Sequence, residues 1–432
     1  MANNPKPVEA LLPVELGKGR IPYARGMKAG RWVFATGVLA TDFRTGLAPG
    51  IVNPRAPLSG RPRYRKEAEA VLERAAEVLA AGGSGLKHAV RTDQFYPSWQ
   101  AVAHFQEARR AAFGDYIPPS TSILEKSLLL PDAGIEIEVI AVEPGMKIEQ
   151  LYAQDIETPA HSGFCPVVRC GDFAFIAGFM AAWQPGDRGG IAPEAKLPEG
   201  HLWKGTRIKL EAEYLFARKL TPALVAAGSS FDHVVKAWVY LSDIEDIPAF
   251  NEIWRQWFPS HPPARIIVPA SRPGFAIADA RIEVNLVALA DNATTRKQVV
   301  ATDVYTGLDG AATAVRAGDL LFISGLLAAD RDGLVPAAEP DARQPYFGSG
   351  IEAQMEHLLA AAQNICMAAG TTLANVVRIQ QFHTDLREFY PACRVWQRLL
   401  PGVPLPVSAI EVPAPLAVPG CSVLLDLWVY AP

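Results

Sequence analysis

The sequence predicts an α+β fold built from three tandem copies of one unit of about 145 residues. Three short patterns predict it, because each occurs three times in the same order along the 432 residues. Self-similarity at a fixed period is the signature of a repeat architecture, in which each copy is one structural unit. We place the three units at residues 1–146, 147–295 and 296–432.

The first pattern is a helix that ends at a glycine and leads into a strand. Gly83, Gly228 and Gly370 lie 145 and 142 residues apart, and each follows a run of small residues. Glycine readily adopts the left-handed conformation that ends a helix. Upstream of the first glycine, apolar residues follow helical spacing at Val71, Leu72, Ala75, Val78 and Leu79. We therefore expect each of these helices to pack an apolar stripe on a sheet.

The other two patterns are strands. One ends in a glycine and recurs at residues 32–37, 173–178 and 320–325, and the other closes each unit at residues 135–141, 282–288 and 425–431. A second helix is expected in each unit at residues 99–113, 247–258 and 387–400. Two helices per unit can cover only one face of a mixed sheet. The uncovered faces would then meet around a pseudo-threefold axis, as separate subunits do in a cyclic trimer.

Composition and charge exclude several function classes. Lys plus Arg (41) nearly balance Asp plus Glu (45), so no broad cationic field points to nucleic acid. The apolar run at 320–327 is far shorter than the roughly 20 residues that span a bilayer. The first residues lack the layout of a secretory signal, so we expect a cytoplasmic protein. Five cysteines with no CxxC pair favour small buried side chains over disulfides or a metal site.

Several short motifs carry a family resemblance. They are Pro22-Tyr23, Thr36-Gly37, Glu136-Ile137-Glu138, Phe250-Asn251-Glu252 and Pro263-Ala264-Arg265, together with the helix-glycine-strand junctions. In this order, the chain resembles the RidA/YjgF (reactive intermediate deaminase) family three times over. The resemblance implies chorismate mutase-like units, each a mixed sheet with two helices on one face. It also implies a pseudo-trimeric ring with a ligand cleft at each interface.

The resemblance also implies a chemistry. Family members that act as deaminases hydrolyse imines and enamines derived from amino acids, without a metal or an organic cofactor. An arginine binds the substrate carboxylate, and a glutamate on the closing strand handles the attacking water. These residue types suit those tasks, because guanidinium pairs with carboxylate through two hydrogen bonds and a carboxylate can accept a proton from water. We therefore expect a cofactor-independent hydrolase acting on a small carboxylated nitrogen compound.

Carried over residue by residue, the family pattern is uneven. The arginine matches Arg265 in the second unit, and the glutamate matches Glu138 in the first. The corresponding residues elsewhere are Thr121 and Val407 for the arginine, and Asn285 and Trp428 for the glutamate. No copy keeps both groups. A fused chain permits such divergence, so we expect one specialised cleft and two structural ones.

The predicted site has two catalytic residues, Glu138 and Arg265, and four substrate-binding residues, Tyr23, Thr36, Asn251 and Ser324. The aromatic position held by Tyr23 corresponds to Phe164 in the second unit and to Ala311 or Tyr305 in the third. Both catalytic assignments have structural alternatives: a salt bridge of Arg265 to Glu283, and an interface ion pair of Glu138.

Two other functions stay open. The same scaffold could open an amide, lactam or other heterocycle by hydrolysis, or it could bind a ligand or act as a scaffold without catalysis. In each case the expected partner is a small molecule. The expected solution state is a monomeric pseudo-trimer of 46.6 kDa, and such rings could also stack. Light scattering measures that state.

Overall fold

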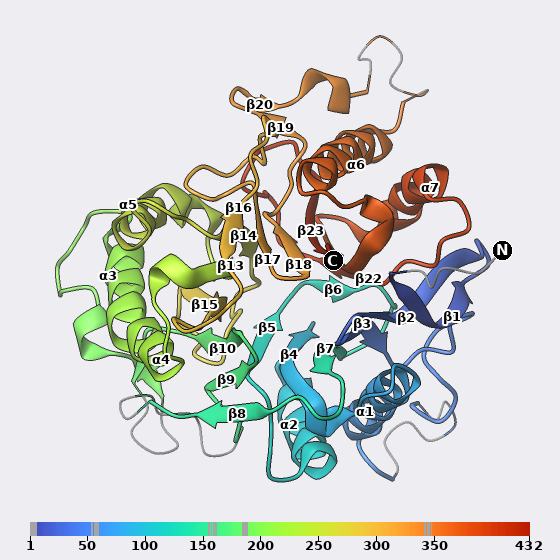
Figure 1. The fold of residues 1–432 in the computed structure, drawn as a ribbon, viewed down its shortest axis with the longest axis horizontal. Helices are drawn as coiled ribbons and strands as arrows, with labels where there is room; N and C mark the ends of the chain where they lie inside the picture. Colours follow the sequence, from blue (N-terminus) through green and yellow to red (C-terminus); the bar gives the residue numbers. More distant parts are fainter. Residues whose placement is uncertain are drawn as a thin grey trace.

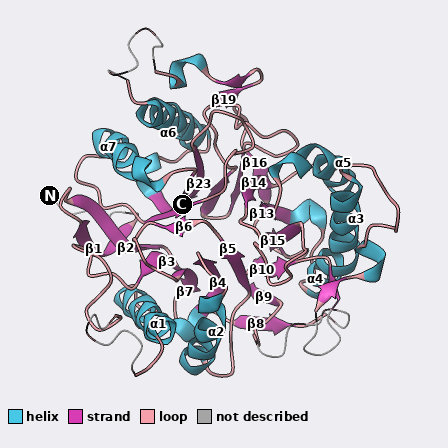
Figure 2. Cartoon of the chain, turned by 180° about the vertical axis from the view of Figure 1, so that it is seen from behind, coloured by secondary structure: helices cyan, strands magenta, loops and turns pink. Residues whose placement is uncertain are grey.

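The computed structural model describes residues 7–52, 55, 60–153, 156, 158, 162–183, 189–340, 343, 346 and 348–432. Three α+β units form a closed ring, with the sheets inside and the helices outside (Figure 1). Figure 2 shows the same arrangement from the opposite face. The predicted fold class and the pseudo-trimeric ring are therefore confirmed. Among the described residues, no helix is both long and apolar enough to cross a bilayer.

Unit 1 has a six-stranded sheet in the order β1-β2-β3-β7-β4-β5. Its strands are β1 (Glu9–Leu16), β2 (Ile21–Ala29), β3 (Trp32–Leu39), β4 (Ala89–Tyr96), β5 (Ser120–Leu124) and β7 (Glu136–Val142). Helices α1 (Arg63–Ala81) and α2 (Gln100–Phe113) cover the outer face. The strands pair antiparallel except β4 with β5, which is parallel. A short strand, β6 (Ser127–Leu128), leaves the unit and pairs with the sheet of unit 3.

Unit 2 repeats this order, with strands β8 (Ile148–Leu151), β9 (Val167–Cys170), β10 (Phe173–Phe179), β13 (Val234–Leu241), β14 (Ala264–Pro269) and β15 (Ile282–Leu289). Its helices are α3 (Thr206–Leu215), a π-helical turn (Phe216–Leu220), α4 (Thr221–Ala226) and α5 (Ile247–Trp257). A small hairpin, β11 (Ala182–Trp183) with β12 (Gly190–Ile191), lies outside the main sheet.

Unit 3 has strands β16 (Lys297–Val299), β17 (Ala314–Ala317), β18 (Leu320–Ile323), β21 (Val376–His383), β22 (Val407–Glu411) and β23 (Val423–Tyr430). Helices α6 (Gly350–Ala368) and α7 (Phe389–Leu399) cover it, and β19 (Ala329–Asp330) pairs with β20 (Gly333–Leu334). Short 3₁₀ turns complete the chain at Leu86–His88, Pro193–Ala195, Phe231–His233, Ile244–Asp246, Pro336–Ala338, Leu373–Asn375 and Leu386–Glu388.

The repeated glycines end the helices as predicted. Gly83, Gly228 and Gly370 have φ of +78°, +61° and +74°, a conformation that costs L side chains energy. The apolar stripe of α1 is buried against the sheet, which confirms that the helix packs one face inward. All five cysteines are buried and free, as the sequence predicts.

The units contact one another head to tail around the ring. The amide of Cys165 in unit 2 donates to the carbonyl of Ile117 in unit 1 (2.8 Å). Corresponding bonds join Ala312 to Pro263 and Ala24 to Leu405, each 3.0 Å long. Units 1 and 2, 2 and 3, and 3 and 1 therefore form three similar interfaces, which we call clefts 1/2, 2/3 and 3/1.

Buried charges lie where the inner faces of the three sheets meet. This central cluster consists of Arg91, Asp93, Glu138, Lys236, Arg378 and Asp426. Arg378 lies 2.5 Å from Glu138 and 3.3 Å from Asp93, both in unit 1. Lys236 of unit 2 pairs with Asp426 of unit 3. Because each ion pair is buried, its members depend strongly on one another for stability.

Candidate functional site

Strand register fixes which residues correspond among the units. On β4, β13 and β21, the residues Arg91, Lys236 and Arg378 each follow a β-bulge and lie opposite the closing strand. Their closing-strand partners are Ile140, Val287 and Trp428, which also pair with Phe34, Phe175 and Phe322 on β3, β10 and β18. The position of Glu138 is therefore held by Asn285 and by Asp426, two residues before Trp428. The predicted match to Trp428 was wrong.

The arginine position also shifts by one residue in unit 1. In the parallel pairs, Ser120 lies opposite Thr92, Arg265 opposite Ala237 and Val407 opposite Ile379. Each of these three partners comes directly after the residue that follows the bulge in its strand: Thr92 after Arg91, Ala237 after Lys236 and Ile379 after Arg378. Ser120 thus corresponds to Arg265, and the predicted match to Thr121 was wrong.

The backbone hydrogen bonds between units show which residues of units 2 and 3 correspond to Tyr23. Tyr23, Phe164 and Ala311 each precede the residue whose amide donates across a cleft. Of the two candidates in unit 3, the structure therefore selects Ala311.

Cleft 2/3 brings three predicted residues together, but the protein itself fills it. The amide of Arg265 donates to Ser324 Oγ (2.8 Å), and its Nη1 donates to Asn251 Oδ1 (2.9 Å). Nη2 donates to the carbonyl of Asp309 (2.6 Å), and Trp254 Nε1 donates to the carbonyl of Gly310 (2.6 Å). Burial lowers the pKa of Arg265 to about 9. Residues 309–310 of unit 3 thus occupy the position where a ligand would approach Arg265.

Cleft 3/1 contains Tyr23 and Thr36, and it is nearly closed. The hydroxyl of Tyr23 donates to the carbonyl of Thr36 (2.9 Å), and Glu136 accepts a hydrogen bond from Ser408. The cavity beside Tyr23, between β2 and α7, has a volume of about 10 Å³, which leaves space for about one water molecule. Trp396 and Cys393 on α7 line this small cavity.

Glu138 lies in the central cluster, away from Arg265. It accepts hydrogen bonds from Arg378 Nε (2.8 Å) and from Gln380 Nε2 (3.1 Å) across the interface of units 1 and 3. Burial raises the pKa of Glu138 to about 7, against the opposing effect of the Arg378 guanidinium. The two predicted catalytic residues therefore lie at different interfaces. The interface ion pair, which the sequence left open for Glu138, is what the structure contains.

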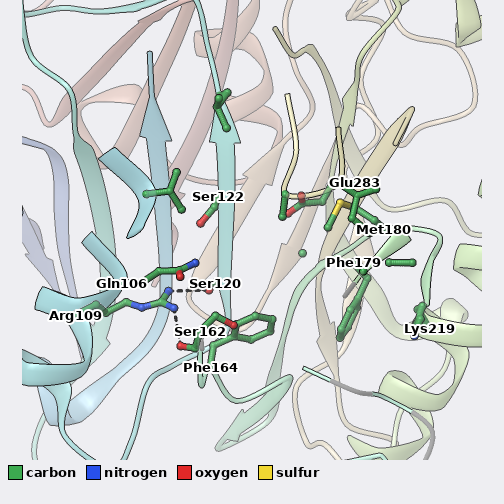
Figure 3. Close-up of a pocket in the computed structure, with 17 residues that line it drawn as sticks. Gln106, Arg109, Ser120, Ser122, Ser162, Phe164, Phe179, Met180, Lys219 and Glu283 are labelled. Carbon is green, nitrogen blue, oxygen red and sulfur yellow. Dashed lines mark hydrogen bonds between the residues drawn. The ribbon is translucent and has the colours of Figure 1, made fainter. Parts of the chain in front are cut away.

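Cleft 1/2 is open, with a cavity of about 260 Å³ (Figure 3). Unit 1 contributes α2 and β5 to its wall, and unit 2 contributes the start of the unit, β10, β15 and the π-helical turn. The labelled polar and aromatic residues around it are Gln106, Arg109, Ser120, Ser122, Ser162, Phe164, Phe179, Lys219 and Glu283.

Arg109 is a buried cation on the wall of this cavity. Its side chain is 1% exposed; Nη1 donates to Ser120 Oγ (3.1 Å) and Nη2 to the carbonyl of Ser162 (2.8 Å). Both acceptors are neutral, and Arg109 forms no ion pair with a carboxylate within the described ranges. Burial lowers the pKa of Arg109 to about 10, so the group is still charged at neutral pH. A buried cation with neutral partners favours an anionic ligand.

Glu283 lies on the opposite side of the same cavity (Figure 3). It is 4% exposed, and no hydrogen bond holds its carboxyl among the residues that the structure describes. Burial raises its pKa to about 8, while Arg91 has a smaller lowering effect. The carboxyl packs against Gly178, where an added Cβ would overlap Glu283 Oε1. Gly178 therefore makes room for the acid. The structural alternative of a salt bridge between Arg265 and Glu283 was wrong, because the two lie in different clefts.

The open cleft was not predicted from the sequence, although one signal was present. Aligned on the helix motifs Phe105-Gln106 and Phe250-Asn251, Arg109 stands where α5 has Trp254. An arginine at a buried helix position that is aromatic in another copy indicates a changed function for that position.

Comparisons with known proteins agree with this architecture. The family model described as Endoribonuclease L-PSP matches residues 18–143, 156–290 and 311–424. A RutC family protein of Saccharolobus solfataricus is 43% identical over 65 residues, which are 15% of this chain and 49% of that protein. Human 2-iminobutanoate/2-iminopropanoate deaminase is 42% identical over 72 residues, 17% of this chain and 50% of the enzyme. The alignments thus span about half the length of these two relatives.

Among solved structures, a chorismatase covers 79% of this chain and 93% of its own, with a TM-score of 0.47 and 13% identity. Three matches of one family model, one in each unit of the ring, cover most of the 432 residues. The chain therefore belongs to the Endoribonuclease L-PSP (RidA/YjgF) family and contains its domain three times.

Proposed function

We propose that cleft 1/2 is an active site that hydrolyses the carbon–nitrogen bond of a small carboxylated imine, or of an enamine after it tautomerises to the imine, by acid–base chemistry of its own side chains. The observation that carries this proposal is Arg109, a buried guanidinium with only neutral partners on the wall of an open cavity. In this proposal, Arg109 takes the carboxylate-binding role that the sequence assigned to Arg265.

Binding follows from charge and hydrogen-bonding capacity. Guanidinium is planar and permanently charged, and it presents paired donors that suit a carboxylate. Two donors of Arg109 are engaged by Ser120 and Ser162, and Nε has no partner among the described residues. A substrate carboxylate would supply the missing negative charge. Ser120, which accepts a hydrogen bond from Arg109, stands at the strand position that Arg265 occupies in unit 2.

Glu283 suits the chemical step because its pKa of about 8 keeps it protonated at neutral pH. As the acid, it would protonate the imine nitrogen and make the carbon electrophilic. The resulting carboxylate would take a proton from water as the water oxygen bonds to that carbon. The same proton would then pass to the amino group, so that ammonia leaves as the C–N bond breaks. The remaining hydroxyl would return its proton to Glu283, leaving a 2-oxo acid.

The similarity to the human deaminase supports the reaction class, because that protein's name states deamination of two 2-imino acids, 2-iminobutanoate and 2-iminopropanoate. It does not supply the residues, since Arg109 comes from a helix and Glu283 lies two positions before the family glutamate position on the closing strand.

The test is release of ammonia and 2-oxo acid from 2-imino acids made in situ by an amino acid oxidase. Wild type should accelerate release, and Arg109→Gln should lower kcat/KM by about 100-fold or more, mainly through KM. Arg110→Gln is the matched control, because Arg110 is the exposed neighbour on the same helix. Absence of turnover by wild type, or equal loss in both variants, would refute the proposal.

A further inference from the structure

The cavity in cleft 1/2 has an apolar region beside its polar groups. Both units contribute to the region, through Val102, Leu124, Phe164, Phe179, Met180 and Ile277. Figure 3 shows the rings of Phe164 and Phe179 on two sides of the same space, with Met180 near Glu283. Aromatic faces and the flexible thioether of methionine pack well against apolar groups of varied shape.

The corresponding space is filled in the other two clefts. Trp254 occupies the helix position in cleft 2/3, where it also contacts Gly310, and Trp396 lines the cavity of about 10 Å³ in cleft 3/1. In cleft 1/2, Arg109 stands at that position and directs its guanidinium to Ser120. Because cleft 1/2 has no tryptophan ring at this helix position, its cavity has more room than a carboxylate and an imine alone would fill.

The volume of the cavity supports the presence of a further apolar group on the ligand. An apolar cavity of about 150 Å³ is sufficient to hold benzene. The cavity in cleft 1/2 has a volume of about 260 Å³, so an aromatic ring fits together with a short carboxylated chain. Its walls place the cation of Arg109 and the rings of Phe164 and Phe179 around one continuous space.

We propose that the substrate of cleft 1/2 carries a large apolar or aromatic side chain in addition to its carboxylate. This inference rests on the proposed function for the reaction, but it concerns binding and can be tested without turnover. The carboxylate binds Arg109, the reacting carbon lies by Glu283, and the apolar body lies between Phe164, Phe179 and Ile277. Substrates with a methyl group in place of that body leave the apolar region unoccupied.

Binding of two 2-oxo acids tests the inference directly. Pyruvate and phenylpyruvate share the carboxylate and the carbonyl, and they differ by one phenyl ring. Isothermal titration calorimetry should show phenylpyruvate binding roughly 30- to 100-fold more tightly, as expected for burial of a phenyl group. Equal affinities, or tighter binding of pyruvate, would overturn the proposal.

Variants locate the effect. Phe179→Ala should reduce the affinity ratio of the two ligands by about tenfold, because only the phenyl group loses contact area. Met180→Ala serves if Phe179→Ala does not fold, since Met180 is partly exposed and lines the same region. Trp99→Ala is the control, because Trp99 is 68% exposed and does not line the cavity. An unchanged ratio in both lining variants would also overturn the proposal.

Turnover separates this inference from the proposed function. If phenylpyruvate binds preferentially but no imine is hydrolysed, the ligand class stands and the reaction fails. If imines derived from alanine and phenylalanine are hydrolysed with equal kcat/KM and the two acids bind equally, the reaction stands and the ligand class fails.

Discussion

The guanidinium groups of Arg109 and Arg265 occupy matching places in successive clefts, although one comes from a helix and the other from a strand. Arg109 lies 5.9 Å from the ring of Phe105, and Arg265 lies 5.8 Å from the ring of Phe250. The two phenylalanines hold the same position in the helix motif of their units. A cation is thus present in both clefts, but only the one in cleft 1/2 lines the large cavity.

Because only Arg109 lines the large cavity, substitution of the two arginines should affect different properties of the protein. Arg109→Gln should abolish most ligand binding, whereas Arg265→Gln should lower the thermal midpoint and leave kcat/KM of the folded protein within about twofold. The reason is that Arg265 holds Asn251 and the carbonyl of Asp309. Differential scanning calorimetry and imine turnover measure the two effects. A greater loss of turnover in Arg265→Gln would return the active site to cleft 2/3.

The acid role of Glu283 predicts a pH profile. With a pKa of about 8 in the free protein, the protonated form dominates below that pH and is lost above it. The value of kcat/KM should therefore fall as pH rises through about 8. Glu283→Gln should reduce kcat by about 100-fold or more, as is typical for loss of a general acid. A profile that rises through pH 8 would show that the ionised form is the active one.

Gly178 predicts a steric effect on the same carboxyl. In Gly178→Ala the new methyl group overlaps Glu283 Oε1 and approaches Thr121 Oγ1. The carboxyl must then move, so we expect activity to fall by about tenfold or more. Gly85→Ala is the control, because its added methyl group meets no atom within 4 Å. Equal activity of both variants with wild type would place the reacting atoms away from Glu283.

Glu138→Gln distinguishes a structural role from a catalytic one. The glutamine would keep the shape but lose a charged hydrogen bond to Arg378, which costs about 1.5–3 kcal/mol when buried. Urea unfolding should detect that loss at pH 8, while imine turnover of the folded variant should change less than twofold. A large loss of turnover at unchanged stability would restore Glu138 as an acid–base group.

Glu136 predicts how stability depends on pH. Burial raises its pKa from 4.5 to about 8, so between these values the folded protein holds a proton that the unfolded chain has lost. The stability from this group is complete below pH 4.5 and disappears as pH rises through 8. In Glu136→Gln, the fall in unfolding free energy across this window should be shallower by up to about 1.4 kcal/mol per pH unit. Denaturant titrations at pH 5, 6.5 and 8 measure the slope, and parallel slopes for the two proteins would contradict the prediction.

The fold was predictable because its markers are local. A glycine that ends a helix and a strand that ends in glycine keep their sequence neighbourhood in every copy, so their period shows the repeat. The register was less predictable. Each unit has a β-bulge in its central strand, between Ala89 and Arg91 in unit 1 and between Val376 and Arg378 in unit 3. The bulge is the same in all three units, so it does not cause the errors. The closing strand of unit 3 was placed two residues late, and because side chains alternate with a period of two, Trp428 fitted the pattern as well as Asp426. Thr121 was misplaced because the parallel pairing of β5 is shifted by one residue relative to that of β14.

The site was predicted in the wrong cleft for a different reason. Family positions were carried over one by one, and this procedure finds a residue only where the family keeps it. Arg109 reaches the cleft from α2, so no family strand position points to it. Closure of cleft 2/3 by residues 309–310 depends on how a loop of unit 3 folds against Trp254, which no local pattern encodes.

The head-to-tail ring also has a mechanical consequence. Two chain connections join three units, whereas three interfaces close the ring. Cleft 3/1 is held without a linker, by contacts such as the backbone bond from Ala24 to Leu405 and the pairing of β6 with β22. Units 1 and 3 can therefore separate without stretching either connection. We expect a chain pulled from its two ends to open first at the interface of these two units.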